Sequence, residues 1–544
     1  MKLVKCIFCF CFLGSLSGFA QSDKIPHLKK QGTATQLIVD GKPFLILGGE
    51  LANSSASSIS YMEPIWSQLT EQNLNTVLLP VSWELIEPQE GKFDFTIVEK
   101  LISAAHQNNL KLVLLWFGSW KNTYSSYVPE WVKRDTKRFP RVLMKDGRPT
   151  ERLTPLSSSN RDADAKAFAS LMKHIRMVDT YHTVLMIQIE NEIGVIPESR
   201  DLSALANTAF DSPVPEPLID YISKHSDNIE PELHGAWVAA GKKTNGNWQE
   251  VFGKEPITDD FFMAWYYATY VDAVTKAGKA EYNIPMFTNA ALIRPNYLPG
   301  QYNSGGPLPH SIDIYRVGAP HLDFISPDIY FSNFAYWAGR YNREGNPLFI
   351  PETYGGAEGA ANAFFAFGKL NAIGLSPFGI DRMRMSSGTG ATSYQSLLAG
   401  AYSTLQHLAP IILQKQGTDQ LSGIVVEGSE QRSGKISFGG YNITVNWAGT
   451  GMPDAQNNPN RRIGIMFIQT DTDEFLITGS GSATLSFNPD SGSQIAGIAS
   501  IDEEVLINGK WIWQRRLNGD ENGQGQILRL GSNAVIYKVR LYRY

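Results

Sequence analysis

Cysteine is almost absent from this chain of 544 residues, because Cys6, Cys9 and Cys11 are its three cysteines and all lie near the start. The remainder has no thiol for a disulfide, a thiolate metal site or a cysteine nucleophile. Charged residues are also scarce, at 19% of the chain, against about 25% in an average soluble domain. Hydrophobic residues reach 43%. This composition excludes a disordered chain and predicts a large packed core.

An excess of positive charge is missing as well. Lysine and arginine number 48, aspartate and glutamate number 53, and the formal net charge is −5. Without basic clusters, we expect no nucleic-acid partner. The nine histidines form no H-E-x-x-H motif, and neither a G-x-S-x-G elbow nor a phosphate-binding loop in a strand-to-helix context is present. We therefore expect no metal and no cofactor.

Long hydrophobic runs are also lacking, since no stretch after the first twenty residues approaches the ~20 apolar residues that a bilayer requires. We expect no membrane span. The N-terminus itself carries Lys2 and Lys5, a short apolar run at 6–13, and small residues up to Ala20. This pattern is typical of a secretory signal peptide. We expect cleavage near Ala20 and export to the periplasm or the exterior, which would remove all three cysteines.

Eight short apolar runs alternate with amphipathic helical patterns from residue 44 onward. Apolar strands separated by helices indicate parallel strands covered on both faces, and eight such units are typical of a (β/α)8 TIM barrel. The third and fourth runs are followed by long segments, so we predict insertions at 117–160 and 195–258 on the catalytic face. The runs begin at Phe44, Asn75, Lys111, Val184, Pro285, Asp323, Pro347 and Ala372.

Different patterns flank the barrel. Asp40-Gly41 lies between two extended runs, which predicts a hairpin. After Gly417, apolar and polar residues alternate and turn residues interrupt them, which predicts an antiparallel β-sandwich-like domain. Trp511 and Trp513 alternate onto one face there, and we interpret them as core residues. The predicted organisation is a signal peptide at 1–20, a barrel at 21–415 and a β domain at 416–544.

Two glutamates follow predicted strands. Glu192 comes two residues after the fourth run, which ends at residue 190, and Glu352 directly follows the seventh, which ends at residue 351. Because a barrel gathers the carboxyl ends of its strands at one mouth, we expect the two side chains to face each other. Glycoside cleavage requires such a pair, in which one carboxyl group protonates the leaving oxygen and the other attacks the anomeric carbon or activates water. A separation of about 5–5.5 Å would indicate retention of configuration.

Further residues at strand ends are candidates for substrate binding. Asn191 is positioned to contact a sugar hydroxyl, and Tyr330 is positioned to hydrogen-bond the nucleophile or to lie in the core. Glu50 ends the first strand, either as a buried charge or as a sugar ligand. Aromatic rings suit the C–H face of a pyranose, although most aromatic residues belong to the core. The candidates for such stacking are Trp83, Trp116, Trp120 and Phe378.

Four segments carry a resemblance to a known family, one of them YVPEWV at residues 127–132. Residues 188–194, QIENEIG, closely resemble the Q-x-E-N-E-[YF]-G motif of glycoside hydrolase family 35, the β-galactosidases of clan A. Residues 347–356, PLFIPETYGG, are similar to its nucleophile segment. Residues 74–95 resemble its second strand region, and also that of family 42. The resemblance implies that Glu192 is the acid/base, Glu352 the nucleophile and Asn191 a sugar contact.

The resemblance implies a secreted bacterial enzyme that releases terminal non-reducing β-D-galactose, with retention, from plant-type oligo- or polysaccharides. Two features depart from the family: Ile86 replaces a histidine, and residues 116–122 lack the Ala-Glu pair that holds galactose. Contacts to the galactose 4- and 6-hydroxyls therefore do not transfer from that strand. The alternatives are a β-glucosidase, β-mannosidase or arabinosidase on the same barrel, or a catalytically idle glycan-binding protein. The sequence predicts no oligomeric state.

Overall fold

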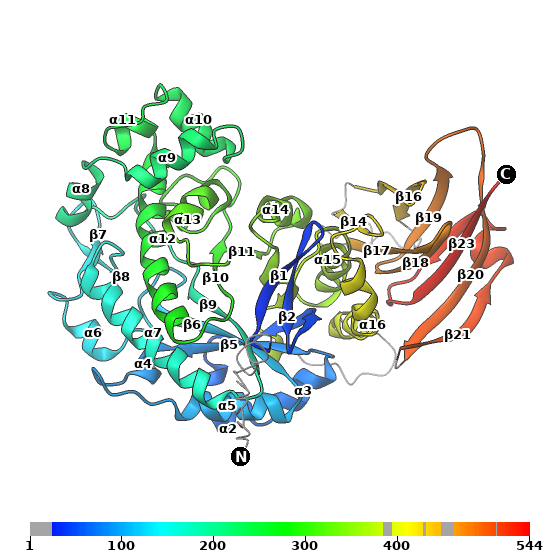
Figure 1. Cartoon of the computed structure of the whole chain (residues 1–544), viewed down its shortest axis with the longest axis horizontal. Coiled ribbons are helices and arrows are strands. Elements are labelled where there is room, and N and C mark those ends of the chain that lie inside the picture. The colour runs from blue at the N-terminus through cyan, green and yellow to red at the C-terminus, as the bar shows by residue number, and fades with distance from the viewer. Residues whose placement is uncertain (1–23, 384–393, 428–430, 448–461, 508) are drawn as a thin grey trace, which may run out of the picture.

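The chain folds into a barrel followed by a β domain (Figure 1). The predicted signal peptide lies outside the described residues. In the part of the chain that is described, we find no helix long and apolar enough to span a bilayer. The computed structural model describes residues 24–383, 394–427, 431–447, 462–507 and 509–544.

Eight parallel strands close the barrel, and β13 pairs with β4 through Gly374 and Ile46. Each strand overlaps one of the eight predicted apolar runs, so the predicted fold class is confirmed. In chain order the strands are β4 (Ile46–Glu50), β5 (Thr76–Ser82), β6 (Lys111–Lys121), β9 (Val184–Asn191), β10 (Met286–Ala291), β11 (Phe324–Ile329), β12 (Phe349–Thr353) and β13 (Gly374–Pro377).

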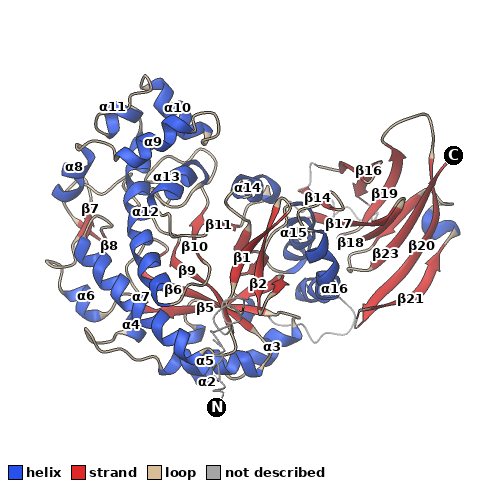
Figure 2. Ribbon diagram, in the orientation of Figure 1, coloured by secondary structure: helices blue, strands red, loops and turns tan. Residues whose placement is uncertain are grey.

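Amphipathic helices cover the outside of the barrel (Figure 2). In α5, Val98, Leu101, Ile102 and Ala105 recur at helical spacing and are all buried. In α7, the Ser157 side chain caps the first turn by accepting the Asn160 backbone N–H. The covering helices are α2 (Ile59–Met62), α3 (Ile65–Glu71), α4 (Trp83–Ile86), α5 (Thr96–Gln107), α7 (Ser158–Val178), α12 (Pro256–Glu281), α13 (Ile312–Gly318), α14 (Phe334–Tyr341), α15 (Gly356–Lys369) and α16 (Tyr394–Lys415).

The long segments after β6 and β9 contain secondary structure of their own. Helices α9, α10 and α11 lie at the end of the molecule remote from the C-terminal sheets (Figure 1). After β6 come α6 (Glu130–Arg134), β7 (Arg141–Leu143) and β8 (Pro149–Leu153), and after β9 come α8 (Ala204–Phe210), α9 (Glu216–Lys224), α10 (Pro231–Ala239) and α11 (Trp248–Phe252).

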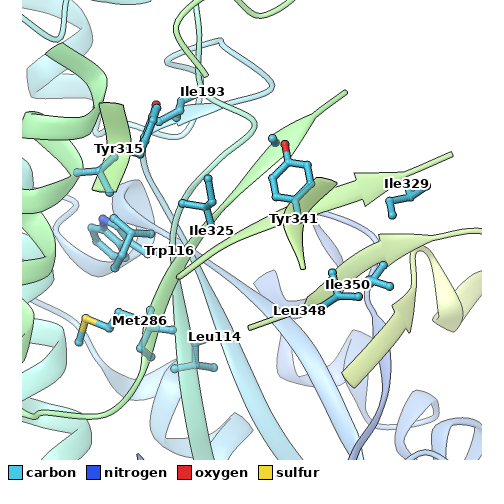
Figure 3. Packing of buried hydrophobic residues seen from close by; sticks show 14 of the residues in the cluster. Leu114, Trp116, Ile193, Met286, Tyr315, Ile325, Ile329, Tyr341, Leu348 and Ile350 are labelled. Atoms are coloured by element: carbon cyan, nitrogen blue, oxygen red, sulfur yellow. The ribbon is translucent and has the colours of Figure 1, made fainter. Parts of the chain in front are cut away.

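Two apolar layers stabilise the barrel. One fills its interior and includes Phe287, Phe324 and Phe349 from neighbouring strands. The other lies between the strands and the surrounding helices and includes Leu114 and Met286 (Figure 3). Because these layers exclude water from the strands, a polar side chain at a strand end has only its neighbours, a ligand or trapped water as partners.

An N-terminal sheet packs against the barrel interior, because Leu37 and Val39 belong to the interior cluster. Its strands are β1 (His27–Gln31), β2 (Ala34–Val39) and β3 (Lys42–Phe44). The predicted turn at Asp40-Gly41 is confirmed, since both residues have positive φ, 49° and 77°. A two-residue hairpin turn of this kind requires that conformation.

The C-terminal domain has two antiparallel sheets around a core of its own. One face of the larger sheet packs on α15, where a Cβ on Gly464 would lie 1.8 Å from the Ala361 carbonyl oxygen. The larger sheet contains β14 (Leu421–Glu427), β17 (Arg462–Asp471), β18 (Glu474–Ser480), β23 (Ile536–Arg543), β20 (Ala496–Ile507) and β21 (Lys510–Leu517). The smaller contains β15 (Ser433–Phe438), β16 (Tyr441–Trp447), β19 (Ala483–Pro489) and β22 (Ile527–Leu530).

The interpretation of Trp511 and Trp513 as core residues is wrong. Both lie on the edge strand β21, where they are 38% and 58% exposed. Alternation along a strand predicts which side chains share a face, but it does not tell whether another layer covers that face.

Substituting Gly278 tests the close contact between α12 and α7. A Cβ there would lie 2.1 Å from Cε1 of Phe168, so Gly278→Ala should overpack the contact and lower the free energy of unfolding by about 1–3 kcal/mol. In the matched control Gly235→Ala on α10, no heavy atom lies within 4 Å of the new Cβ. The control should be more stable than wild type by about 0.5–1 kcal/mol, because alanine favours the helix. Urea unfolding measures both, and equal effects would contradict this packing.

Candidate active site

Three carboxyl groups converge where the barrel strands end. One carboxylate oxygen from each of Glu192, Asp328 and Glu352 lies within 4.8 Å of the other two. Glu192 follows β9, Asp328 lies in β11 and Glu352 lies in β12. The structure thus brings together the two glutamates that the sequence predicted as a pair. Their separation is compatible with the shorter carboxyl–carboxyl distance of about 5–5.5 Å that is typical of retaining glycoside hydrolases.

Glu352 is held by donors from two other strand ends, that of the neighbouring β11 and that of the more distant β9. The Tyr330 hydroxyl donates to Oε2 at 2.9 Å, and the Asn191 amide donates to Oε1 at 3.3 Å. The Lys121 ammonium lies 4.0 Å from Oε1. The carboxyl group is 5% exposed, so these groups replace the water that would otherwise stabilise a negative charge. The structure thus brings both Tyr330 and Asn191 into contact with Glu352.

Glu192 lies on a turn that directs it back into the mouth. Its φ is 45°, in the left-handed region. Its backbone N–H donates to Asn289 Oδ1 at 3.0 Å, and its carbonyl accepts from Asn303 Nδ2 at 2.9 Å. The residue is partly exposed, but protein surrounds its carboxyl group closely. Desolvation, and next the charge of Glu352, raise the pKa of Glu192 to about 7, while Lys121 opposes the shift.

Beside the two glutamates, the cluster contains Asp328 and a fourth acid, Glu50. Asp328 accepts from Asn289 Nδ2 at 2.6 Å, and Glu50 at the end of β4 is fully buried. Neither carboxyl oxygen of Glu50 has a hydrogen-bond partner among the described residues. Desolvation, and next the charge of Glu352, raise the pKa of both Asp328 and Glu50 well above the ordinary range. The raised pKa values favour the protonated forms of both acids. Because the carboxyl oxygens of Glu50 have no partner among the described residues, they are available to a ligand hydroxyl.

Glu190, the first glutamate of the 188–194 segment, has a different place. Its carboxyl group accepts the backbone N–H of Ser119 at 3.1 Å and that of Trp120 at 2.7 Å. It also contacts Asp164, and burial together with the second acid raises the pKa of Glu190 well above the ordinary range. This fully buried pair, Glu190 and Asp164, holds the irregular end of β6 rather than facing the mouth.

Three of the four predicted aromatic platforms lie in the core. Trp83, Trp116 and Trp120 have no exposed surface, and their indole N–H groups donate to Glu87, to Asp164 and to the Leu153 carbonyl, in that order. A sugar cannot reach these rings as they are placed. Phe378 is partly exposed and forms a bridge with Glu50 at the mouth, so it alone of the four has a position suited to contact with a sugar.

Sequence reasoning missed several residues of the site. Asp328 lies two residues before Tyr330, and Asn289 lies in the fifth predicted strand. Both are polar residues at the end of an apolar run, which is the signal that identified Glu192 and Glu352, so the same signal could have found them. Lys121 lies five residues beyond the predicted end of the third strand, and its sequence position gave no sign that it enters the mouth.

Among the residues that the structure describes, Glu192, Asp328 and Glu352 form the acidic group whose oxygens converge as metal ligands do. The oxygens of Glu352 already face the Lys121 ammonium and the Tyr330 hydroxyl. The Lys121 ammonium therefore supplies positive charge to this cluster, and we assign the cluster to proton transfer and nucleophilic chemistry.

Sequence comparison agrees with this chemistry. Residues 59–347, more than half of the chain, match the profile of glycoside hydrolase family 42, which is described as "Beta-galactosidase". Residues 398–529 match a domain of unknown function, DUF5597. A β-galactosidase of Xanthomonas manihotis is 28% identical over 182 residues, which are 32% of this chain and 28% of the relative. The chain therefore covers little more than a quarter of that relative's length.

Solved structures of similar fold include two β-galactosidases. The enzyme of Bacillus circulans sp. alkalophilus has a TM-score of 0.47 and 12% identity over 91% of this chain and 99% of that chain. Gan42B, a GH42 β-galactosidase of G. stearothermophilus, has a TM-score of 0.49 and 12% identity over 94% of this chain and 100% of that chain.

The assignment to family 35 is wrong, because the barrel matches the family 42 profile. The segments around Glu192 and Glu352 carry the paired carboxylates that glycoside cleavage requires. Because different families meet the same chemical requirement, such segments identify the chemistry more securely than the family.

Replacing Glu192 by glutamine tests the cause of its raised pKa. The folded protein keeps this proton up to about pH 7, whereas the unfolded chain releases it near the ordinary value of 4.5. Wild type should therefore lose stability relative to Glu192→Gln as pH rises from 4.5 to 7, by roughly 3 kcal/mol, since one pKa unit corresponds to about 1.4 kcal/mol. Urea unfolding at several pH values measures the difference, with exposed Glu216→Gln as the control. A difference between wild type and Glu192→Gln that does not change with pH would contradict the assignment.

Proposed function

Because the chain belongs to glycoside hydrolase family 42, we propose that it is a retaining exo-β-galactosidase that releases terminal non-reducing β-D-galactose. The observation that carries the proposal is the contrast between two carboxyl groups within 4.8 Å of each other. Glu192 has a pKa of about 7, whereas Glu352 is surrounded by groups that stabilise negative charge. One acid poised to give a proton and one poised to attack suit double displacement.

In the first step, a carboxylate oxygen of Glu352 attacks the anomeric carbon from the face opposite the leaving group. The glycosidic C–O bond breaks, and Glu192 gives its proton to the departing oxygen. In the second step, Glu192 takes a proton from water, the water oxygen attacks the anomeric carbon, and the bond to Glu352 breaks. Two inversions release galactose with its original β configuration.

The neighbouring side chains have separate tasks in this scheme. Tyr330 donates a hydrogen bond to Glu352 and keeps the attacking carboxylate oriented. Asn191 lies between Glu352 and Lys121, within reach of the hydroxyl next to the anomeric carbon. The unpaired carboxyl group of Glu50 accepts or donates a hydrogen bond at the far side of the sugar, and Phe378 offers an apolar surface there.

We also propose that the protein acts outside the cytoplasm on plant-type galactosides. The N-terminal pattern of two lysines, a short apolar run and small residues up to Ala20 supports export. The two segments that follow β6 and β9 support an extended substrate, because barrel loops on this face form substrate clefts.

Removing the nucleophile provides the direct test of the mechanism. Glu352→Ala should lose nearly all activity on an aryl β-galactoside, and added azide should restore turnover and yield the α-galactosyl azide, because azide enters the vacated space. Product configuration is read by NMR, and Glu84→Ala is the control, since that glutamate pairs with Lys133 and is partly exposed. Formation of a β-azide, or no rescue at all, would remove Glu352 from this role.

A panel of substrates tests the sugar preference. Among nitrophenyl β-galactoside, β-glucoside, β-mannoside and α-arabinoside, the galactoside should give the largest kcat/KM, and Glu192→Ala should lower it for natural leaving groups more than for nitrophenol. If another glycoside is cleaved in preference to the galactoside, the protein is still a glycoside hydrolase, but the proposed galactose specificity is refuted. Binding of galactose with no cleavage of any member would favour the glycan-binding alternative.

A further inference from the structure

Lys121 is a buried cation inside a cluster of acids. It ends β6 and is 6% exposed. Its Nζ donates to Asn191 Oδ1 at 2.7 Å and lies 4.0 Å from Glu352 Oε1. A buried ammonium is costly unless its charge is balanced and its hydrogen atoms find acceptors. Here Asn191 accepts a hydrogen bond from Nζ, and the Glu352 carboxylate supplies nearby negative charge.

We propose that Lys121 is a positioning residue that orients the Asn191 amide and holds Glu352 as a charged nucleophile. The effect of Lys121 on catalysis rests on the proposed function, whereas its contacts with Asn191 and Glu352 follow from the geometry alone.

The orientation of the Asn191 amide follows from the chemistry of the lysine. An ammonium group donates hydrogen bonds and accepts none, so the Asn191 oxygen must face Lys121. The Asn191 nitrogen then faces Glu352, 3.3 Å from Oε1. Without the lysine, the Asn191 oxygen loses its donor in this chain of contacts, and the Glu352 carboxylate alone is left to orient the amide through its nitrogen.

The charge of Lys121 is balanced by acids from four parts of the barrel: Glu50 on β4, Glu192 after β9, Asp328 on β11 and Glu352 on β12. Burial disfavours the ammonium form, but these carboxyl groups outweigh it and raise the pKa of Lys121. The centroid of the Phe117 ring also lies 5.2 Å from Nζ. The lysine therefore stays charged at neutral pH.

The bulge in β6 explains how the lysine reaches this place. Trp116 pairs with Ile189 and Lys121 pairs with Asn191, so five steps along β6 match two along β9. The extra residues are held by Glu190, which accepts the backbone N–H groups of Ser119 and Trp120. Gly118 has no room for a side chain, since a Cβ would lie 2.4 Å from Trp116 Nε1.

The test compares Lys121→Met and Lys121→Arg with the matched control Lys279→Met. Lys279 is also a partly buried lysine bonded to a carboxylate, 2.7 Å from Asp323, but Asp323 precedes β11 at the opposite end of the barrel. Two measurements are made on the full chain: the pH profile of kcat/KM on nitrophenyl β-galactoside, and the pH dependence of urea unfolding.

Lys121→Met should lower kcat/KM about 100-fold, since the nucleophile loses its orientation. It should also move the alkaline limb of the pH profile upward by about one pH unit, because the charge that opposes the raised pKa of Glu192 is gone. Lys121→Arg should keep the wild-type profile and recover part of the rate, and Lys279→Met should match wild type in both. A merely structural defect would reduce activity without moving the limb.

Unfolding gives a second readout that needs no activity. Without Lys121 the folded acids retain protons to higher pH while the unfolded chain is unchanged, so stability should fall more steeply with pH. The stability difference between wild type and Lys121→Met should therefore widen from pH 5 to pH 8. A constant difference together with an unmoved pH profile would overturn the inference. If wild type cleaves no glycoside, the proposed function fails, and the unfolding data still decide whether Lys121 governs the charge of the cluster.

Discussion

The removal of water from a group of carboxyl groups at the barrel mouth is the constraint on which this site depends. Glu50, Glu192, Asp328 and Glu352 lie at the ends of apolar strands, with the Lys121 ammonium beside them. Four negative charges cannot be accommodated there, because each would lose its hydration and repel its neighbours. Protons must therefore remain on some of these groups at neutral pH, so one cluster holds both protonated and ionised carboxyl groups.

The surrounding hydrogen bonds decide which group takes which role. Glu352 receives donors from Tyr330 and Asn191 and lies beside Lys121, all of which favour negative charge. Glu192 donates and accepts through its backbone, with Asn289 and Asn303, so these bonds place the residue without using its carboxyl group.

A second acid pair shows that position matters more than residue type. Glu190 lies two residues before Glu192, yet its carboxyl group is bonded to the backbone of β6 and to Asp164. Both glutamates have positive φ, and this local backbone directs two acids of one short segment to different tasks. Glu190 supports the bulge in β6 that places Lys121 at the mouth, and Glu192 itself faces the mouth.

Much of the fold and the central pair of the site followed from the sequence. The eight apolar runs determined the barrel, because strands buried on both faces must be apolar along their length. Glu192 and Glu352 were identified because a charged residue directly after such a run is conspicuous. The same chemistry occurs in more than one family, so the resemblance to family 35 named the wrong one.

Only the tertiary structure decided the rest. Lys121 enters the mouth through a bulge that depends on Glu190, which is distant in the sequence. The burial of Trp83, Trp116 and Trp120 and the exposure of Trp511 and Trp513 depend on which layers cover each strand. A strand's own residues determine its periodicity, but contacts between distant segments determine what lies beside each side chain, and those contacts set its charge and its role.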